Sequence, residues 1–169
     1  MKNTTEENIK IKNSYFEMQI MGNVRPDGVQ MLSGNFQSLM DKKIFPNEYK
    51  PNYWIGKVFD KIIQEMKSYV KARQDLVRQY AKKYGEDGKE VDENGKVTKE
   101  WKKGDLMSLA NNNKIPIWED YNAFLKDIEE LQEIEIDLGI SKVEFDLEKG
   151  PDTTPGEMLI LIPLLKEPE

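Results

Sequence analysis

The sequence contains one long segment in which apolar residues recur at helical spacing. Between residues 52 and 84 most apolar positions are three or four apart, and the segment holds no proline. The apolar positions are Ile55, Val58, Phe59, Ile62, Ile63, Met66, Tyr69, Val70, Val77 and Tyr80. This spacing predicts one α-helix with a continuous apolar face, and Gly85 suits the left-handed position that ends a helix. At 1.5 Å per residue the helix would be about 50 Å long, so the rest of the fold must be arranged around it.

A second amphipathic helix is predicted from residue 117 to residue 138, followed by Gly139. Its apolar side carries Trp118, Tyr121, Phe124, Leu125, Ile128, Leu131 and Ile134. Between residues 57 and 83 basic residues outnumber acidic ones eight to three, whereas between residues 119 and 137 acidic residues outnumber basic ones eight to one. Because opposite charges select the pairing of two apolar faces, we expect an antiparallel helix pair. Its expected buried residues are Phe59, Ile62, Ile63, Met66, Tyr69, Phe124, Leu125, Ile128 and Leu131.

The segment between the two helices, residues 85–113, is rich in turn-forming and charged residues. Asn94-Gly95 is typical of a two-residue β-hairpin turn, with candidate strands at Lys89–Glu93 and Lys96–Trp101. We expect a projecting hairpin insertion. A hairpin with so little apolar support is marginal in water, so we interpret it as a contact element that a partner protein orders, with a tolerated surface insertion as the alternative. Its candidate partner-binding residues are Lys89, Val91, Asn94, Lys96 and Trp101.

The N-terminal part is predicted to contain short elements. Residues 1–13 are polar and are expected to form a flexible tail. Apolar residues then alternate with polar ones from Tyr15 to Ile20, which predicts a half-buried strand. Pro26-Asp27-Gly28 predicts a turn, after which Val29–Leu32 returns as a second strand. Ser33 is a candidate N-cap for a short helix that carries Phe36, Leu39 and Met40.

The C-terminal part is predicted to contain one strand and one short helix. Ile140, Val143, Phe145 and Leu147 indicate the strand. Thr154-Pro155-Gly156-Glu157 combines a capping threonine, a proline at the first helical position and a glutamate three residues after the cap, so Met158–Ile162 should be helical. The expected fold is a single α+β domain over residues 1–169: an antiparallel long-helix hairpin with a projecting β-hairpin and short N- and C-terminal strands.

The residue types restrict the chemistry. With no histidine and no cysteine, the chain lacks an imidazole base, a thiolate nucleophile and the usual zinc or iron–sulfur ligands. The turn at Asp92, Asn94 and Gly95 resembles a calcium loop, but Trp101 occupies the position of the bidentate glutamate. Glu129 and Glu133 share a helix face and are expected to be solvated rather than to hold a metal. We therefore expect no enzyme activity, no metal and no cofactor, with a carboxylate–metal hydrolase as a distant alternative.

Charge and hydropathy also restrict the partners. Lys67, Lys71, Arg78 and Lys82 could contact phosphates or pair with the acidic second helix. The net charge of −6 and a pI of about 5.0 argue against nucleic acid. The longest apolar run, Met158–Leu165, is eight residues long and contains a proline, whereas a membrane helix needs about 20 residues. We therefore expect no membrane partner.

Several turn and cap motifs occur in a characteristic order. They are Lys71-Ala72-Arg73-Gln74-Asp75-Leu76-Val77, Lys82-Lys83-Tyr84-Gly85, Glu86-Asp87-Gly88-Lys89, Val91-Asp92-Glu93-Asn94-Gly95, Glu133-Ile134-Glu135-Ile136 and Thr154-Pro155-Gly156-Glu157-Met158. In this order the chain resembles small uncharacterised proteins of tailed bacteriophages and prophages, over about residues 36–166. The resemblance implies a viral source and an α+β helical-hairpin fold, and it implies no reaction.

Together these observations predict a phage-encoded, non-enzymatic protein-interaction component. The first hypothesis is a virion structural or assembly protein that binds other phage proteins as an oligomer or within a larger assembly. The second is a small effector that binds a host protein or a signalling molecule to counter defence. The expected location is the virion or the cytoplasm of the infected bacterium.

Overall fold

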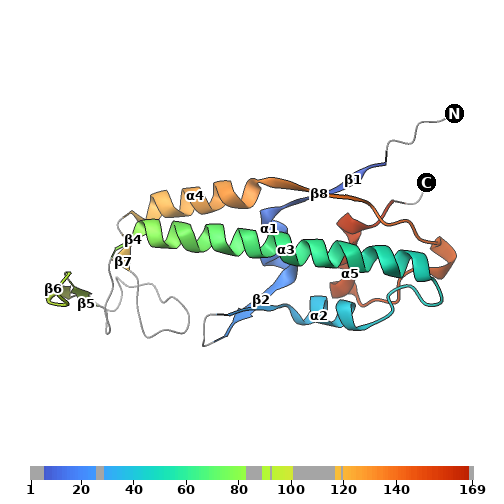
Figure 1. The fold of residues 1–169 in the computed structure, drawn as a ribbon, viewed down its shortest axis with the longest axis horizontal. Helices are drawn as coiled ribbons and strands as arrows, with labels where there is room; N and C mark the ends of the chain where they lie inside the picture. Colours follow the sequence, from blue (N-terminus) through green and yellow to red (C-terminus); the bar gives the residue numbers. More distant parts are fainter. Residues whose placement is uncertain are drawn as a thin grey trace. The chain divides into compact units, whose positions relative to one another are not determined.

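The computed structural model describes residues 6–25, 29–82, 89–91, 93–100, 117–118 and 120–167. It combines helices with short paired strands, which confirms the α+β class (Figure 1). The chain divides into two compact units. The first unit comprises Met1–Gly22, Leu32–Tyr69 and Gln132–Glu169, and the second comprises Asn23–Met31 and Val70–Leu131. That residues 1–169 form a single domain stays a prediction.

The first unit begins with a strand where a flexible tail was expected. Strand β1 (Asn8–Lys12) pairs antiparallel with β8 (Glu135–Ser141), with Lys10 opposite Asp137. Ile9 and Ile11 point into the core and are buried. The polar composition of this segment did not indicate a strand. When only one face of a short strand is covered, two apolar side chains are enough to form that face.

The segment expected to be a strand from Tyr15 to Ile20 is helical. It forms α1 (Asn13–Tyr15) and a π-helical turn η1 (Phe16–Ile20). Phe16 and Ile20 are buried, whereas Met18 is 74% exposed. A strand would have placed Met18 on the same face as these two residues. The spacing of four between Phe16 and Ile20 also fits a helical turn, and contact with the core selects that alternative.

The next hairpin and helix were correctly predicted in outline. Strand β2 (Met21–Val24) pairs with β3 (Gln30–Leu32), so the first strand of the hairpin lies later than expected. The predicted turn residues 26–28 lie outside the described part. Ser33 caps α2 (Gly34–Asp41) by accepting the Phe36 N–H at 3.2 Å. Leu39 is buried with Phe36, but Met40 is exposed.

The long helix is confirmed as α3 (Tyr49–Tyr80). It begins earlier than residue 52 because Pro51 is tolerated in a first helical turn, and it ends before residue 84. Gly85 lies outside the described residues. Of the α3 residues that were expected to be buried, Phe59, Ile62, Met66 and Tyr69 are buried and Ile63 is half-buried. Ile55 and Val58 of the apolar face are buried as well.

In the core of the first unit, most of the side chains that accompany those of α3 come from segments other than α4. The Phe36 and Phe59 rings meet edge to face with centroids 5.1 Å apart, and Phe16 lies 6.0 Å from Tyr69. Further fully buried side chains come from both ends of the chain and from the segment before α3: Ile9, Ile20, Leu39, Ile44, Phe45, Leu138, Ile160 and Leu161. The sequence-based core list was therefore incomplete, because these residues lie in segments too short to show a helical period.

The second helix is shorter than predicted. Helix α4 spans Tyr121–Glu133, Ile117–Trp118 forms β7, and the remainder belongs to β8. The reason is visible in Glu133-Ile134-Glu135-Ile136-Asp137-Leu138, which alternates with the period of a strand. Phe124 and Ile128 are buried as predicted, but Leu125 is 38% exposed and Leu131 is half-buried.

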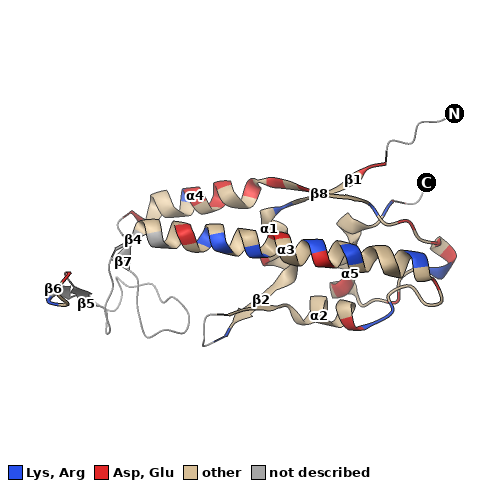
Figure 2. Cartoon of the chain, in the orientation of Figure 1, with Lys and Arg blue, Asp and Glu red and all other residues tan. Residues whose placement is uncertain are grey.

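Within the second unit, the end of α3 contacts α4 through Tyr80. Its hydroxyl donates to Asp127 at 2.5 Å, and its ring lies 6.1 Å from that of Phe124. This hydrogen bond raises the pKa of Tyr80. Figure 2 shows lysine and arginine along α3 and acidic residues along α4. Lys71 is one of the basic residues that could have paired with the acidic helix. Among the described residues of this unit, it makes no ion pair with α4.

Two further strand pairs belong to the second unit. Strand β4 (Ala81–Lys82) pairs antiparallel with β7. Strand β5 (Lys89–Val91) pairs antiparallel with β6 (Val97–Glu100), with Val91 opposite Val97. Gly95 has a φ of +80°, a left-handed conformation that glycine adopts without steric cost. A hairpin is therefore present, but its strands are shorter than expected and the connection from Val91 to Val97 is longer than the predicted two-residue turn.

The C-terminal helix is confirmed as α5 (Pro155–Leu161), and η4 (Ile162–Leu164) follows it. Thr154 caps α5 by accepting the Glu157 N–H at 3.3 Å. The strand expected over residues 140–147 was placed too late. Val143 makes only an isolated parallel bridge to Leu165, and Leu147 begins the 3-10 turn η3 (Leu147–Lys149). No helix within the described residues is long and apolar enough to cross a membrane.

Candidate functional site

A wide groove of about 990 Å³ opens on the first unit. One wall is formed by the start of α3, and the other by the end of β8 and the segment that follows it. The lining residues are Glu6, Glu7, Glu48, Lys50, Pro51, Trp54, Lys166 and the continuous segment 139–146. The groove therefore brings together four stretches of the chain that are far apart in sequence.

The first wall is held in place by Asn52. Its side-chain amide donates to the carbonyls of Phe45 at 2.7 Å and Glu48 at 2.8 Å, and its oxygen accepts the Phe45 N–H at 3.0 Å. Asn47 has a φ of +61°, a left-handed conformation that asparagine tolerates better than most residues. These features fix the bend that carries Glu48 to the edge of the groove, directly before the first turn of α3.

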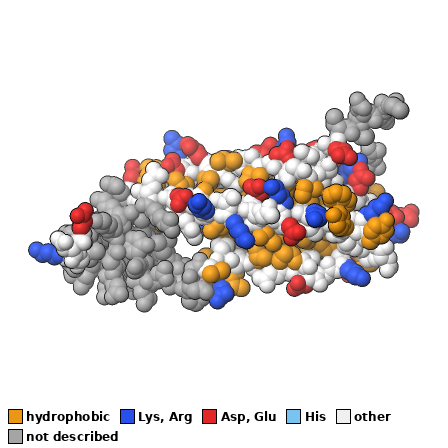
Figure 3. Space-filling model, in the orientation of Figure 1, with side chains coloured by type: hydrophobic (Ala, Val, Ile, Leu, Met, Phe, Trp, Pro, Cys, Tyr) orange, Lys and Arg blue, Asp and Glu red, His pale blue; other side chains and the backbone are white. Residues whose placement is uncertain are grey.

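An exposed aromatic cluster lies on the first turns of α3. Tyr49, Tyr53 and Trp54 are 79%, 58% and 51% exposed. The rings of Tyr53 and Trp54 meet edge to face at 5.3 Å, and the Lys57 ammonium lies 5.6 Å from the centre of the Tyr53 ring. Hydrophobic side chains gather over this part of α3, with lysines between them (Figure 3). Trp54 belongs both to this cluster and to the groove.

The second wall is extended backbone fastened at several points. The Lys142 N–H donates to the Glu7 carbonyl at 3.1 Å, and the Lys166 N–H donates to the Val143 carbonyl at 2.9 Å. The Phe145 ring, which lines the groove, packs on the buried Phe45 ring with centroids 5.5 Å apart. These contacts anchor the second wall to the core.

Charged side chains line the groove, and several are paired. The Lys142 ammonium lies 3.3 Å from the Glu7 carboxylate, and the Lys166 ammonium lies 2.8 Å from the Glu144 carboxylate. Glu48 differs from these acids. Its Oε2 atom is buried and has no hydrogen-bond partner among the described residues, which is an unfavourable state for a carboxylate oxygen.

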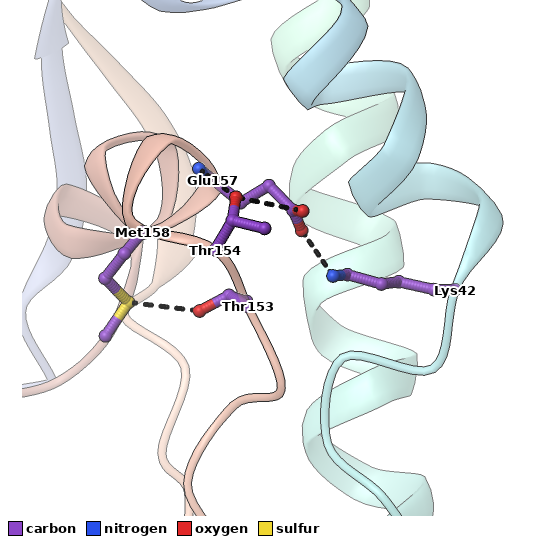
Figure 4. A network of polar contacts seen from close by, with 5 residues as sticks. All are labelled: Lys42, Thr153, Thr154, Glu157 and Met158. Atoms are coloured by element: carbon purple, nitrogen blue, oxygen red, sulfur yellow. Dashed lines mark hydrogen bonds and ion pairs between the residues drawn. The ribbon is translucent and has the colours of Figure 1, made fainter.

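Two other acids of the first unit, one buried and one half-buried, are bound by groups of the protein. Glu157 pairs with Lys42 at 2.5 Å and accepts a hydrogen bond from Thr154 at 3.1 Å (Figure 4). Glu17 accepts hydrogen bonds from Tyr69 and, at 2.8 Å, from Gln132. These contacts join η1, α3 and the end of α4 and have a structural role. The described residues contain no group of three or more acidic side chains placed to hold a metal ion.

The predicted partner-binding residues belong to a different part of the chain, the β5–β6 hairpin. Lys89 and Val91 lie on β5, Asn94 lies in the turn, and Lys96 follows it. Asn94 and Lys96 are exposed. Trp101, the predicted anchor, lies outside the described residues, as does Asp92 of the calcium-loop comparison.

One feature of the sequence could have indicated the groove. Tyr53 and Trp54 are large aromatic residues at positions off the apolar face defined by Ile55, Val58 and Ile62. Aromatic side chains on the polar side of a helix are candidates for a binding surface. The opposite wall had no comparable signal, because its residues form the groove only through tertiary contacts.

No protein-family model matches this chain, and no curated protein or solved structure shows significant similarity to it.

Proposed function

We propose that this chain is a non-enzymatic protein-interaction component, most specifically a phage virion structural or assembly protein that binds other proteins. The observation that carries the proposal is the exposed aromatic cluster at the edge of the charged groove. Tyrosine and tryptophan dominate the binding energy of many protein interfaces, because they bury a large area with few rotatable bonds. Three such side chains close together on one helix are a costly surface to leave in water.

The finer architecture belongs to the same proposal. In it, α3 and α4 form an antiparallel helical hairpin, and the β5–β6 hairpin projects as a second contact element with Lys89, Val91, Asn94, Lys96 and Trp101. The phage source is supported by the order of turn and cap motifs over about residues 36–166. The protein would act within the virion or in the cytoplasm of the infected bacterium, in an oligomer or a larger assembly.

The test is mass spectrometry of purified phage particles produced in the presence of a tagged copy of this chain. A virion component is expected in particles at a fixed ratio to the major capsid protein. Trp54→Ala is expected to reduce incorporation, whereas Leu159→Ala is expected to leave it unchanged, because Leu159 is equally exposed but lies outside the groove. Particles that lack the wild-type chain would overturn the virion proposal.

The alternative function is a small phage effector that binds a host protein or a signalling molecule. The volume of the groove supports this alternative, because about 990 Å³ lies at the upper end of the range for small-molecule sites. Expression early in infection, together with absence from particles, would support this alternative. A host protein recovered with the wild-type chain and lost with Trp54→Ala would identify the groove as the effector surface.

A further inference from the structure

We propose that the groove of the first unit binds an extended segment of a partner protein that carries lysine or arginine. The inference rests on the proposed function and names the chemistry of the partner. In this arrangement a basic side chain of the partner pairs with Glu48, and the neighbouring apolar part of the segment covers Trp54. Three separate features of the groove support this occupant.

The first feature is the state of Glu48. One of its carboxylate oxygens is removed from water without a hydrogen bond from the described residues. The dipole of the nearby start of α3 is favourable to a negative charge, but it supplies no hydrogen-bond donor to this oxygen. An ammonium or guanidinium group from a partner would supply a charge-assisted hydrogen bond. The cost of burying the carboxylate would then be offset in the complex.

The second feature is the charge that remains after internal pairing. Lys142 and Lys166 are each engaged by an acid of the groove itself. Asp146 is also paired, with the Lys149 ammonium at 3.8 Å. Of the remaining charged lining residues, Glu6 and Glu48 are acidic and Lys50 is basic. The groove therefore presents an excess of negative charge to an incoming ligand. A basic segment is attracted to it, whereas an acidic peptide or a nucleic acid is repelled.

The third feature is the shape of the groove. Its second wall is a run of eight consecutive residues, 139–146, that begins in β8 and continues as extended chain. A wall of consecutive residues opposite an aromatic side chain fits an extended peptide, in which alternate side chains point in opposite directions. Side chains on one side of the segment reach the acids, and those on the other side reach Trp54.

The test measures binding of fluorescent peptides to the full-length chain by anisotropy. The first probe is a short end-blocked peptide that alternates lysine with valine. The matched probes carry glutamate or glutamine in place of lysine. We expect the lysine peptide to bind at least about tenfold more tightly than the glutamine peptide, and the glutamate peptide not to bind. Added salt should weaken the binding, because the contacts are partly exposed charges.

Two variants test whether the peptide binds in the groove. Glu48→Gln and Trp54→Ala should each weaken the lysine peptide by about tenfold. Glu130→Gln, an exposed acid on α4, and Leu159→Ala are the matched controls and should leave binding unchanged. Circular dichroism should show the same helical signal for all four variants.

Three results would overturn the inference: no binding of the lysine peptide up to about 1 mM, equal binding of the glutamate peptide, or binding that neither groove variant weakens. These failures are distinct from failure of the proposed function. A chain that is incorporated into particles but does not bind the lysine peptide would remain an interaction component that uses another surface, such as the β5–β6 hairpin.

Discussion

At the scale of single residues, Glu157 shows how a charge is held in the core of the first unit. The Lys42 ammonium and the Thr154 hydroxyl both bind its carboxylate (Figure 4). The Lys42 contact is the main reason that the pKa of Glu157 is lowered, although burial acts in the opposite direction. Glu157 therefore connects the end of α2 to the start of α5, two elements that are far apart in the sequence.

Glu157→Gln should destabilise the protein by about 1–3 kcal/mol at neutral pH, because it leaves Lys42 without its charged partner. Since the folded-state pKa is lower than the unfolded one, the contribution is fully present above the ordinary glutamate pKa. It is lost as the pH falls through the lowered value. Urea unfolding at pH 7 and at pH 3 measures the difference between the variant and the wild type.

The difference should shrink in acid, and Glu130→Gln, an exposed acid, should show almost no difference at either pH. A Glu157→Gln penalty that stays constant between pH 7 and pH 3 would contradict the assigned role of the carboxylate charge.

Two leucines provide a matched comparison of burial. Leu138 in β8 is 2% exposed, whereas Leu125 in α4 is 38% exposed. Leu138→Ala should cost about 2–5 kcal/mol, the usual range for truncation in a packed core. Leu125→Ala should cost less than about 1 kcal/mol, because the removed atoms are partly in water. Chemical denaturation of both variants measures these values, and equal losses would be inconsistent with the observed packing.

At the scale of elements, the β5–β6 hairpin is the clearest candidate for removal without loss of the fold. Its described strands pair with each other, and an isolated pair of strands contributes little stability. Replacing residues 88–100 with a short glycine–serine linker should preserve the helical circular-dichroism signal and the cooperativity of melting. The same variant should lose assembly if the hairpin is a contact element.

The outcome for the hairpin separates its two interpretations. If the shortened chain is incorporated into particles as efficiently as the wild type, the hairpin is a tolerated insertion. The aromatic cluster of α3 would then be the main binding surface. Combining the shortened hairpin with Trp54→Ala would show whether the two surfaces act independently, since the effects of independent sites add.

At the scale of the whole molecule, the described residues contain no group of three or more acidic side chains placed to hold a metal ion. We therefore expect divalent metals to contribute nothing to stability. Thermal unfolding should show the same midpoint in EDTA and in stoichiometric Ca²⁺ or Mg²⁺, because a ligand that binds only the folded state would raise it. A rise of several degrees with either ion would establish a metal site and would reopen the carboxylate–metal alternative.

The sequence by itself determined the features that depend on neighbouring residues. The periodicity of α3, the caps at Ser33 and Thr154, and the Asn94-Gly95 turn all follow from contacts within a few positions of the chain. Each can therefore be predicted from a local pattern, and each is present in the structure.

Only the tertiary structure decided the features that depend on distant partners. Residues 134–138 continue a helical pattern as well as a strand pattern, and β8 forms because β1, more than 120 residues away, pairs with it. Residues 15–20 become helical because their buried positions meet the core. The groove has the same origin, since its walls come from four separate stretches of the chain. A local pattern carries no information about which distant segment will cover it, so these features could not be predicted from spacing alone.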